Sequence, residues 1–81
     1  MAMKKVIIYS TPTCVYCKLA KDFLTKHAVS YEEHDVAADL ERRKEMVEKS
    51  HQLGVPVIDI ADEIFVGFDK DGISRALDIK E

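Results

Sequence analysis

The chain has 81 residues, of which 47% are hydrophobic and 33% charged, so we expect one small folded domain spanning residues 1–81 and no long disordered segment. Its formal net charge of -3 and its pI near 5.6 disfavour a nucleic-acid or membrane-surface binder, because either would carry a basic patch. No apolar run approaches the ~20 residues of a membrane span, and the run after Lys4 and Lys5 is too short for a signal-peptide core.

The first half of the chain predicts a strand, a helix and a second strand. Val6 to Tyr9 is a continuous β-branched and aromatic run, as expected for a strand covered on both faces. A loop of residues 10–13 follows, and then apolar residues recur at helical spacing. The expected inward stripe of this helix is Val15, Leu19, Ala20, Phe23 and Leu24. A second strand is expected from about Val29 to Val36.

A second helix is predicted after Asp39, whose side chain suits the N-cap position. The residues expected to face inward are Leu40, Met46 and Val47. The helix is expected to end near Leu53, because Gly54 is a typical helix stop.

The remaining residues predict a β-hairpin followed by a last helix. Strands at residues 55–60 and 64–66 are joined by a short turn, and Asp69 or Asp71 caps the helix. The order βαβ then ββα requires a parallel, right-handed crossover followed by an antiparallel hairpin. The predicted fold is therefore α/β, a four-stranded mixed sheet with helices on its faces.

The two cysteines of the chain, Cys14 and Cys17, lie where the first strand gives way to the first helix. A pair with this spacing can close and reopen a disulfide, which indicates thiol–disulfide exchange. Unpaired N–H groups at the helix start favour negative charge, so Cys14 is expected to be the exposed nucleophile. Cys17, one turn further on, is placed to attack the resulting mixed disulfide. Lys18 and Lys21 could add a positive field, but both are expected to be solvated.

The same two cysteines allow three other interpretations. They could be half of a zinc site, but only His27, His34 and His51 could complete the ligands, without the paired spacing such sites show. Surface positions are the simpler expectation for these histidines. The pair could also be a static disulfide or two inert core thiols. We expect a cytoplasmic protein, and a single pair in that reducing compartment is more often catalytic than structural.

Three further positions each have two interpretations. Pro56 could simply begin a strand, or it could form a cis peptide bond that leaves the backbone of Val55 free to pair with an extended, thiol-bearing substrate. Gly67 suits a turn, but backbone N–H groups there could also hold a carboxylate. The acidic residues after it would oppose an anion and could recognise an ammonium group. Asp59 also has two interpretations. An outward or strand-end position is favoured over a role in proton transfer to or from Cys17.

The turn Cys14-Val15-Tyr16-Cys17, the turn Gly54-Val55-Pro56 and the segment Gly67-Phe68-Asp69 occur in the order and at the distances found in glutaredoxins and NrdH-redoxins, which the chain therefore resembles. The resemblance implies a βαβαββα thioredoxin fold with sheet order 2-1-3-4 and a cis Val55–Pro56 bond. It also implies Cys14 as nucleophile, Cys17 as resolving thiol, and no tightly bound cofactor. The substrate or glutathione contacts that it implies are Thr11, Tyr16, Val55, Pro56, Gly67 and Asp69.

Some residues depart from the glutaredoxin pattern in the direction of NrdH-redoxins. Val15 stands where glutaredoxins usually have proline, and Thr11 where they have a basic residue. Phe68 and Lys70 replace the second glycine and the aspartate of the glutathione site, and residues 66–71 resemble the Ser-Gly-Phe-x-x-Asp run of NrdH-redoxins. The resemblance is therefore compatible with two electron donors, which are glutathione, as a co-substrate, and a thioredoxin reductase.

The expected function is that of a monomeric thiol–disulfide oxidoreductase in electron transport and cell redox homeostasis. Its substrate would be a disulfide-bearing protein or a glutathione mixed disulfide, and NrdH-redoxins suggest ribonucleotide reductase as a client. Two alternatives from another class are a module that binds a 2Fe–2S cluster with the help of glutathione and a structural metal-binding domain.

Overall fold

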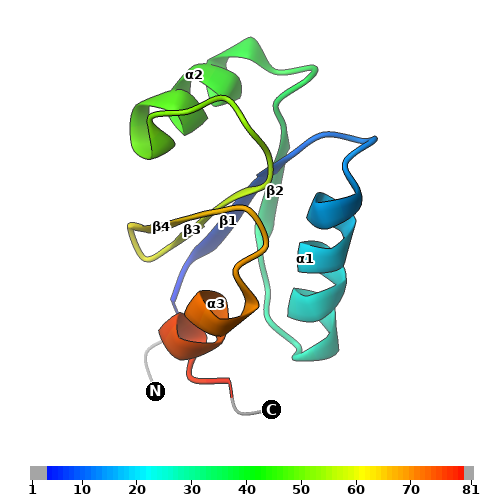
Figure 1. The fold of residues 1–81 in the computed structure, drawn as a ribbon, viewed down its shortest axis with the longest axis vertical. Helices are drawn as coiled ribbons and strands as arrows, with labels where there is room; N and C mark the ends of the chain where they lie inside the picture. The colour runs from blue at the N-terminus through cyan, green and yellow to red at the C-terminus, as the bar shows by residue number, and fades with distance from the viewer. Residues whose placement is uncertain (1–3, 80–81) are drawn as a thin grey trace.

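The computed structural model describes residues 4–79. In chain order they form β1 (Val6–Ser10), α1 (Val15–Lys26), β2 (Glu32–Asp35), α2 (Leu40–Ser50), β3 (Val57–Ile60), β4 (Glu63–Val66) and α3 (Lys70–Leu77). β1 pairs with β2 in parallel and with β3 antiparallel, and β3 pairs antiparallel with β4. The predicted mixed sheet of order 2-1-3-4 is confirmed (Figure 1).

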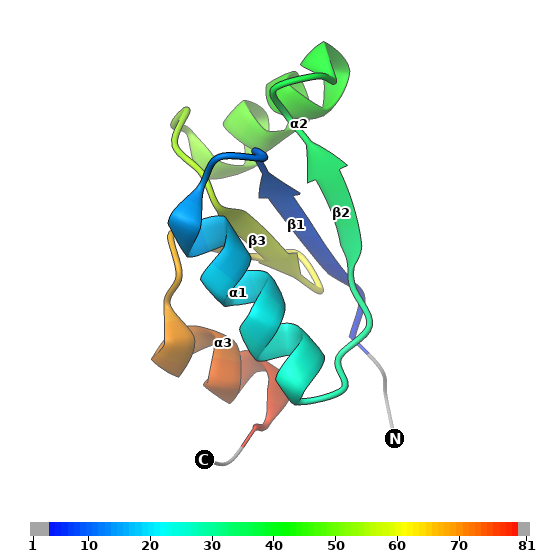
Figure 2. The same cartoon turned by 90° about the vertical axis from the view of Figure 1, so that its right-hand side faces the viewer.

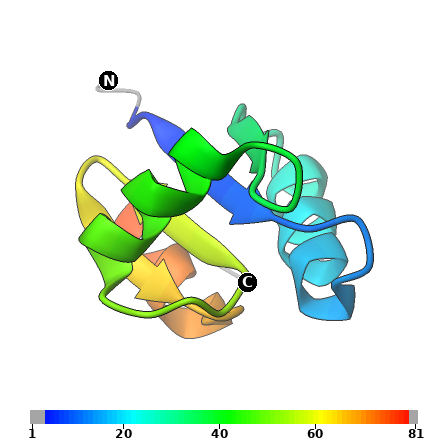
Figure 3. The same cartoon turned by 90° about the horizontal axis from the view of Figure 1, so that it is seen from above.

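Helices cover both faces of this sheet, and Figure 3 shows β1 between α1 and α2. Successive strand residues point to opposite faces, so the apolar run of β1 feeds two cores. One core lies against α1 and α3 and contains Ile8, Leu24, Ile58, Ile60 and Ile73. The other lies against α2 and contains Tyr9, Val36, Met46 and Val57.

The end of α2 differs from the sequence-based prediction. The helix ends at Ser50, so an end near Leu53 with Gly54 as the stop is wrong. His51 adopts the left-handed conformation at φ 60° and closes the helix in the way that a glycine or asparagine usually does. Gly54 is instead held by the Gln52 side chain, which accepts from its N–H over 2.5 Å and donates to its carbonyl over 3.0 Å.

Three apolar residues that were expected to face the core are exposed. Val15 and Leu40 are 69% and 64% exposed, and Leu19 is 44% exposed. Val15 and Leu40 are the first residues of α1 and α2, where each helix is still at the margin of the packed layers. The periodicity that marks a helix does not show where along its length packing begins.

The β3–β4 hairpin turns at Ala61 and Asp62, whose φ angles are 50° and 72°. β3 begins two residues later than expected, because the Val55–Pro56 peptide bond precedes it; this bond is cis, as the resemblance implies. Asp69, and not Asp71, caps α3 by accepting from the N–H of Gly72 over 3.0 Å. Over residues 4–79, no helix has both the length and the apolar character needed to cross a bilayer.

Candidate active site

Cys14 is the N-cap residue of α1. Its sulfur accepts a hydrogen bond from the backbone N–H of Cys17 over 3.2 Å, and its own N–H donates to the carbonyl of Thr11 over 3.3 Å. The Cys14 side chain is partly exposed. The sulfur therefore lies where the free N–H groups and the dipole of a helix favour negative charge, and where a substrate could reach it.

Cys17, in the first turn of α1, is fully buried. Burial raises the pKa of its thiol from the ordinary value of 9.0 to about 12, and the hydrogen bond and charge of Cys14 act in the same direction. A backbone hydrogen bond from Thr11 and the charge of Lys21 oppose this rise. The expected difference in exposure between the two thiols is thus confirmed: Cys14 is partly exposed and Cys17 is buried. The burial of Cys17 also disfavours its thiolate.

The segment before β3 forms a second side of the site. The Cys14 thiol donates to the carbonyl of Val55, with a sulfur–oxygen distance of 3.9 Å, and the neighbouring Pro56 is buried. Pro56 in turn accepts from the N–H of Gly67 over 2.8 Å. Figure 2 shows the start of α1 beside this segment and beside the connection from β4 to α3. The fold thus brings three of the predicted motifs together.

The polar groups expected to hold glutathione near Gly67 bind the protein itself in this structure. The N–H of Gly67 is used by Pro56, and the carbonyl of Gly67 accepts from Asp69 over 3.1 Å. The Asp69 carboxylate caps α3. Gly67 has φ of 80°, which suits the turn interpretation of this residue.

Exposed apolar side chains border the site on each of its segments. Val15 and Tyr16 lie between the two cysteines, Leu53 lies just before Val55, and Val66 directly precedes Gly67. We call Val15, Tyr16, Leu53 and Val66 the apolar rim; each is at least 53% exposed. Exposed apolar side chains beside a reactive group can be covered by the surface of a partner protein.

Lys21 is held in a hydrogen-bonded cluster that the sequence did not reveal. Its Nζ lies 2.8 Å from Oε2 of Glu33, and the buried Ser10 hydroxyl donates to the same oxygen over 2.9 Å. The bond from Lys21 is the main cause that lowers the pKa of Glu33. The expectation that Lys21 is simply solvated is wrong, because its partners come from β1 and β2. The only sequence feature that could have drawn attention to Lys21 is its spacing of four residues from Cys17, which places the two residues on the same side of a helix.

Asp59 is also placed differently from its prediction. It is buried within β3, and its Oδ2 accepts from Lys49 over 2.7 Å, so an outward or strand-end position is wrong. Burial opposes the charge of Lys49, but hydrogen bonds to Asp59 and Tyr9 outweigh it and raise the Lys49 pKa. This cluster lies on the α2 face of the sheet, whereas α1, with Cys17, covers the other face. Asp59 is therefore not positioned to exchange a proton with Cys17.

The three histidines were expected at the surface, and none of them is buried. His51 is exposed, while the ring of His27 packs edge-on against Phe23 at 4.7 Å and His34 bonds to Glu32 over 2.7 Å. Within the part of the chain that the structure describes, no three side chains among His, Cys, Asp and Glu gather as metal ligands. Residues 4–79 therefore contain no group of side chains that could form the zinc site considered above.

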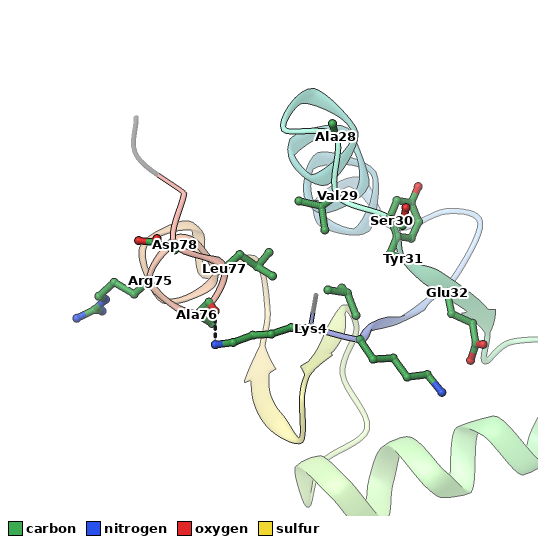
Figure 4. A pocket seen from close by; sticks show the side chains of 12 residues that line it. Lys4, Ala28, Val29, Ser30, Tyr31, Glu32, Arg75, Ala76, Leu77 and Asp78 are labelled. Atoms are coloured by element: carbon green, nitrogen blue, oxygen red, sulfur yellow. Dashed lines mark hydrogen bonds between the residues drawn. The ribbon is translucent and has the colours of Figure 1, made fainter. Parts of the chain in front are cut away.

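A groove of about 750 Å³ lies away from the cysteines (Figure 4). It is lined by the start of β1, the connection from α1 to β2 and the end of α3, where Lys4 donates to the carbonyl of Ala76 over 2.5 Å. Neither Cys14 nor Cys17 lines it. The groove is therefore separate from the dithiol site.

Comparisons with known proteins agree with this arrangement. The chain is 44% identical over 71 residues to an uncharacterized glutaredoxin-like 8.6 kDa protein of a rubredoxin operon in Clostridium pasteurianum, covering 88% of this chain and 95% of the relative. It is 36% identical to glutaredoxin 3 of Escherichia coli K12, covering 83% and 81%. It is 33% identical to the glutaredoxin-like protein NrdH of Lactococcus lactis, covering 78% and 86%.

A solved structure of a mutant of the thioredoxin-like protein BC3987 superposes with a TM-score of 0.89 at 32% identity, covering 96% of this chain and all of the other. The family model described as Glutaredoxin matches residues 6–66, which include both cysteines and the first two of the three motifs and end directly before Gly67. The chain therefore belongs to the glutaredoxin family and has its thioredoxin-like fold.

Proposed function

We propose that the protein is a dithiol thiol–disulfide oxidoreductase in which Cys14 attacks and Cys17 resolves. The observation that carries this proposal is the inequality of the two thiols. The Cys14 sulfur is partly exposed and accepts an N–H from the start of α1, whereas Cys17 is buried with its pKa raised to about 12. Only a thiolate attacks a disulfide, so at neutral pH the first attack belongs to Cys14.

In the first step the Cys14 thiolate attacks a substrate disulfide, and one substrate sulfur leaves as a thiolate. In the second step Cys17 loses its proton and attacks the Cys14 sulfur, so that a Cys14–Cys17 disulfide forms and the second substrate thiol is released. Two of the causes that raise the Cys17 pKa come from Cys14 itself. Both are removed once the Cys14 sulfur is in a disulfide, so Cys17 becomes easier to ionise at the step that needs its thiolate.

The surroundings favour a protein as the partner of this dithiol. The apolar rim offers side chains that a protein surface can cover, and each one fully covered contributes about 1.5–3 kcal/mol before binding costs. Glutathione carries two carboxylates, while the N–H of Gly67 and the carboxylate of Asp69 are already used within the fold. The negative charge of Asp69 would also repel a carboxylate of glutathione.

We therefore infer that a thioredoxin reductase, more than glutathione, reduces the Cys14–Cys17 disulfide. The chain is similar both to a glutaredoxin and to an NrdH protein, so the choice rests on these site features. Its substrate is a disulfide-bearing protein in a reducing compartment such as the cytoplasm. The NrdH relative suggests ribonucleotide reductase as the client.

The test is to supply oxidised protein with NADPH and thioredoxin reductase, and in parallel with glutathione, glutathione reductase and NADPH. We expect NADPH consumption at least tenfold faster with thioredoxin reductase at equal protein concentration. Faster consumption with glutathione would overturn the choice of reductant and leave the dithiol mechanism standing. When insulin is added to both systems as the terminal disulfide substrate, a wild-type rate of NADPH consumption in a Cys14→Ser variant would overturn the mechanism itself.

A further inference from the structure

Lys21 and Cys17 lie on the same side of α1, because residues four apart on a helix are neighbours. The ammonium group of Lys21 does not extend freely into water. It is fixed by Glu33 over 2.8 Å, and Glu33 is itself fixed by the hydroxyl of Ser10 over 2.9 Å. Ser10 is only 1% exposed, so this anchor belongs to the packed interior at the end of β1. The Lys21 side chain is thus held in place on the side of α1 that carries the buried thiol.

We propose that Lys21, anchored by Glu33 and Ser10, is a positioning residue that stabilises the thiolate of Cys17 during the resolving step. The inference rests on the proposed function, because it assigns a role within the second step of that mechanism. Glu33 and Ser10 act through Lys21, and Lys21 acts through Cys17.

The step can be written in full. Cys17 gives up its proton, its sulfur forms a bond to the sulfur of Cys14, and the bond from Cys14 to the substrate sulfur breaks. The electron pair of the broken bond leaves on the substrate sulfur, which takes up a proton and departs as a thiol. The dithiol is oxidised by two electrons and the substrate is reduced by two. Negative charge passes through the Cys17 sulfur, so a nearby fixed cation speeds this step.

Lys21 is the positively charged group that favours the thiolate of Cys17. The largest charge effects on Cys17 come from Cys14, which disfavours its thiolate, and from Lys21, which favours it. Lys21 interacts in turn with Glu33 and Tyr31. The buried pair of Lys49 and Asp59 lies across the sheet.

Lys21 keeps its charge through the neutral range, since its hydrogen bond to Glu33 raises its pKa. The Glu33 side chain is 41% exposed, so water screens its opposing charge, whereas Lys21 is 27% exposed. The anchor thus fixes the ammonium group without cancelling its effect on the buried sulfur.

The two steps can be separated with one equivalent of dithiodipyridine, an uncharged disulfide that releases a coloured thiopyridone at each step. The first release depends on probe concentration and reports attack by Cys14. The second does not, and it reports resolution by Cys17. We expect Lys21→Met to leave the first phase unchanged and to slow the second about threefold. For each unit by which a thiol pKa rises, the thiolate fraction falls about tenfold, and the greater nucleophilicity of the more basic thiolate restores about threefold.

The pH profile of the second phase should also move to higher pH in Lys21→Met. Lys21→Arg, which keeps the charge, should restore the wild-type rate and profile. Lys44→Met is the matched control, because it removes an exposed lysine from α2 and should change neither phase. An unchanged second phase in Lys21→Met, equal slowing of both phases, or no recovery with arginine would each overturn the inference. If the wild type itself released only one thiopyridone, the proposed function would fail instead.

Discussion

The backbone N–H of Cys17 donates to the sulfur of Cys14 over 3.2 Å, while the thiol of Cys17 is fully buried. Cys17 thus stabilises negative charge on the Cys14 sulfur through its backbone N–H, while burial of its own thiol favours the protonated form. Because the hydrogen bond comes from the backbone, a change of the Cys17 side chain leaves it in place. The two steps of the proposed reaction can therefore be separated by substitution.

The pKa of Cys17 should fall in a Cys14→Ala variant. Cys14 supplies two of the causes that raise this pKa to about 12, but burial remains the largest cause. We expect a value between 9.0, the ordinary one, and 12. Thiolate absorbance in the ultraviolet as a function of pH measures it directly, since this variant has one thiol. A value that stays near 12 or drops below 9.0 would contradict the assignment of causes.

The same raised pKa links stability to alkaline pH in the reduced wild type. The folded state holds the Cys17 proton more tightly than the unfolded chain does, so this contribution is complete below pH 9.0 and is lost as the pH rises toward 12. Cys17→Ala should lose less of its free energy of unfolding over that range. Urea denaturation at several alkaline pH values tests the comparison, and parallel losses in both proteins would contradict it.

The apolar rim should matter for protein substrates only. We expect Tyr16→Ser and Leu53→Ser each to lower kcat/KM for insulin reduction by about threefold to tenfold, as for interface side chains of moderate importance. Their rates with a small uncharged disulfide should stay at the wild-type value. Leu40→Ser is the control, because Leu40 is 64% exposed but lies outside the apolar rim. Equal losses with both substrates would point to a damaged dithiol instead of a contact surface.

The buried pair on the α2 face should govern stability and not catalysis. Lys49→Met leaves the Asp59 carboxylate buried without its cation, whereas Asp59→Asn leaves Lys49, whose side chain is 30% exposed, able to reach water. We therefore expect Lys49→Met to cost about 2–3 kcal/mol in the free energy of unfolding and Asp59→Asn less. Urea denaturation gives both values. A slower second phase of dithiodipyridine reduction in Asp59→Asn would restore a proton-transfer role for Asp59.

Gly72→Ala should destabilise the protein although Gly72 lies within a helix. Alanine normally gains about 1 kcal/mol over glycine there. A Cβ at Gly72, however, would lie 2.5 Å from Oδ2 of Asp69 and 2.8 Å from the ring of Phe65. Loss of the Asp69 cap and displacement of Phe65 should outweigh the gain by about 1–2 kcal/mol. Thermal denaturation decides the sign, and a stabilised variant would show that the cap and the ring move aside freely.

Local patterns were enough to predict the elements of this fold and their order. The strand of Val6 to Tyr9, the helix after Cys14 and the hairpin each have a periodicity that short stretches of sequence reveal. The unequal thiols follow from the same reasoning, because a helix start is a local feature. The Glu33 anchor of Lys21 and the burial of Asp59 against Lys49 were missed, because their partners are distant in the sequence. His51 was missed as the end of α2, because glycine is the usual residue in the left-handed position after a helix and Gly54 follows closely.

The division of roles between Cys14 and Cys17 is tested most directly by intact-protein mass spectrometry of single-cysteine variants treated with a disulfide probe at about pH 7. We predict that Cys17→Ser accumulates a stable mixed disulfide on Cys14 at the wild-type rate of the first step. We predict that Cys14→Ser forms no adduct on the same timescale, because its remaining thiol is buried and protonated. Rapid adduct formation on Cys17 in the Cys14→Ser variant, with an unreactive Cys17→Ser variant, would contradict the account.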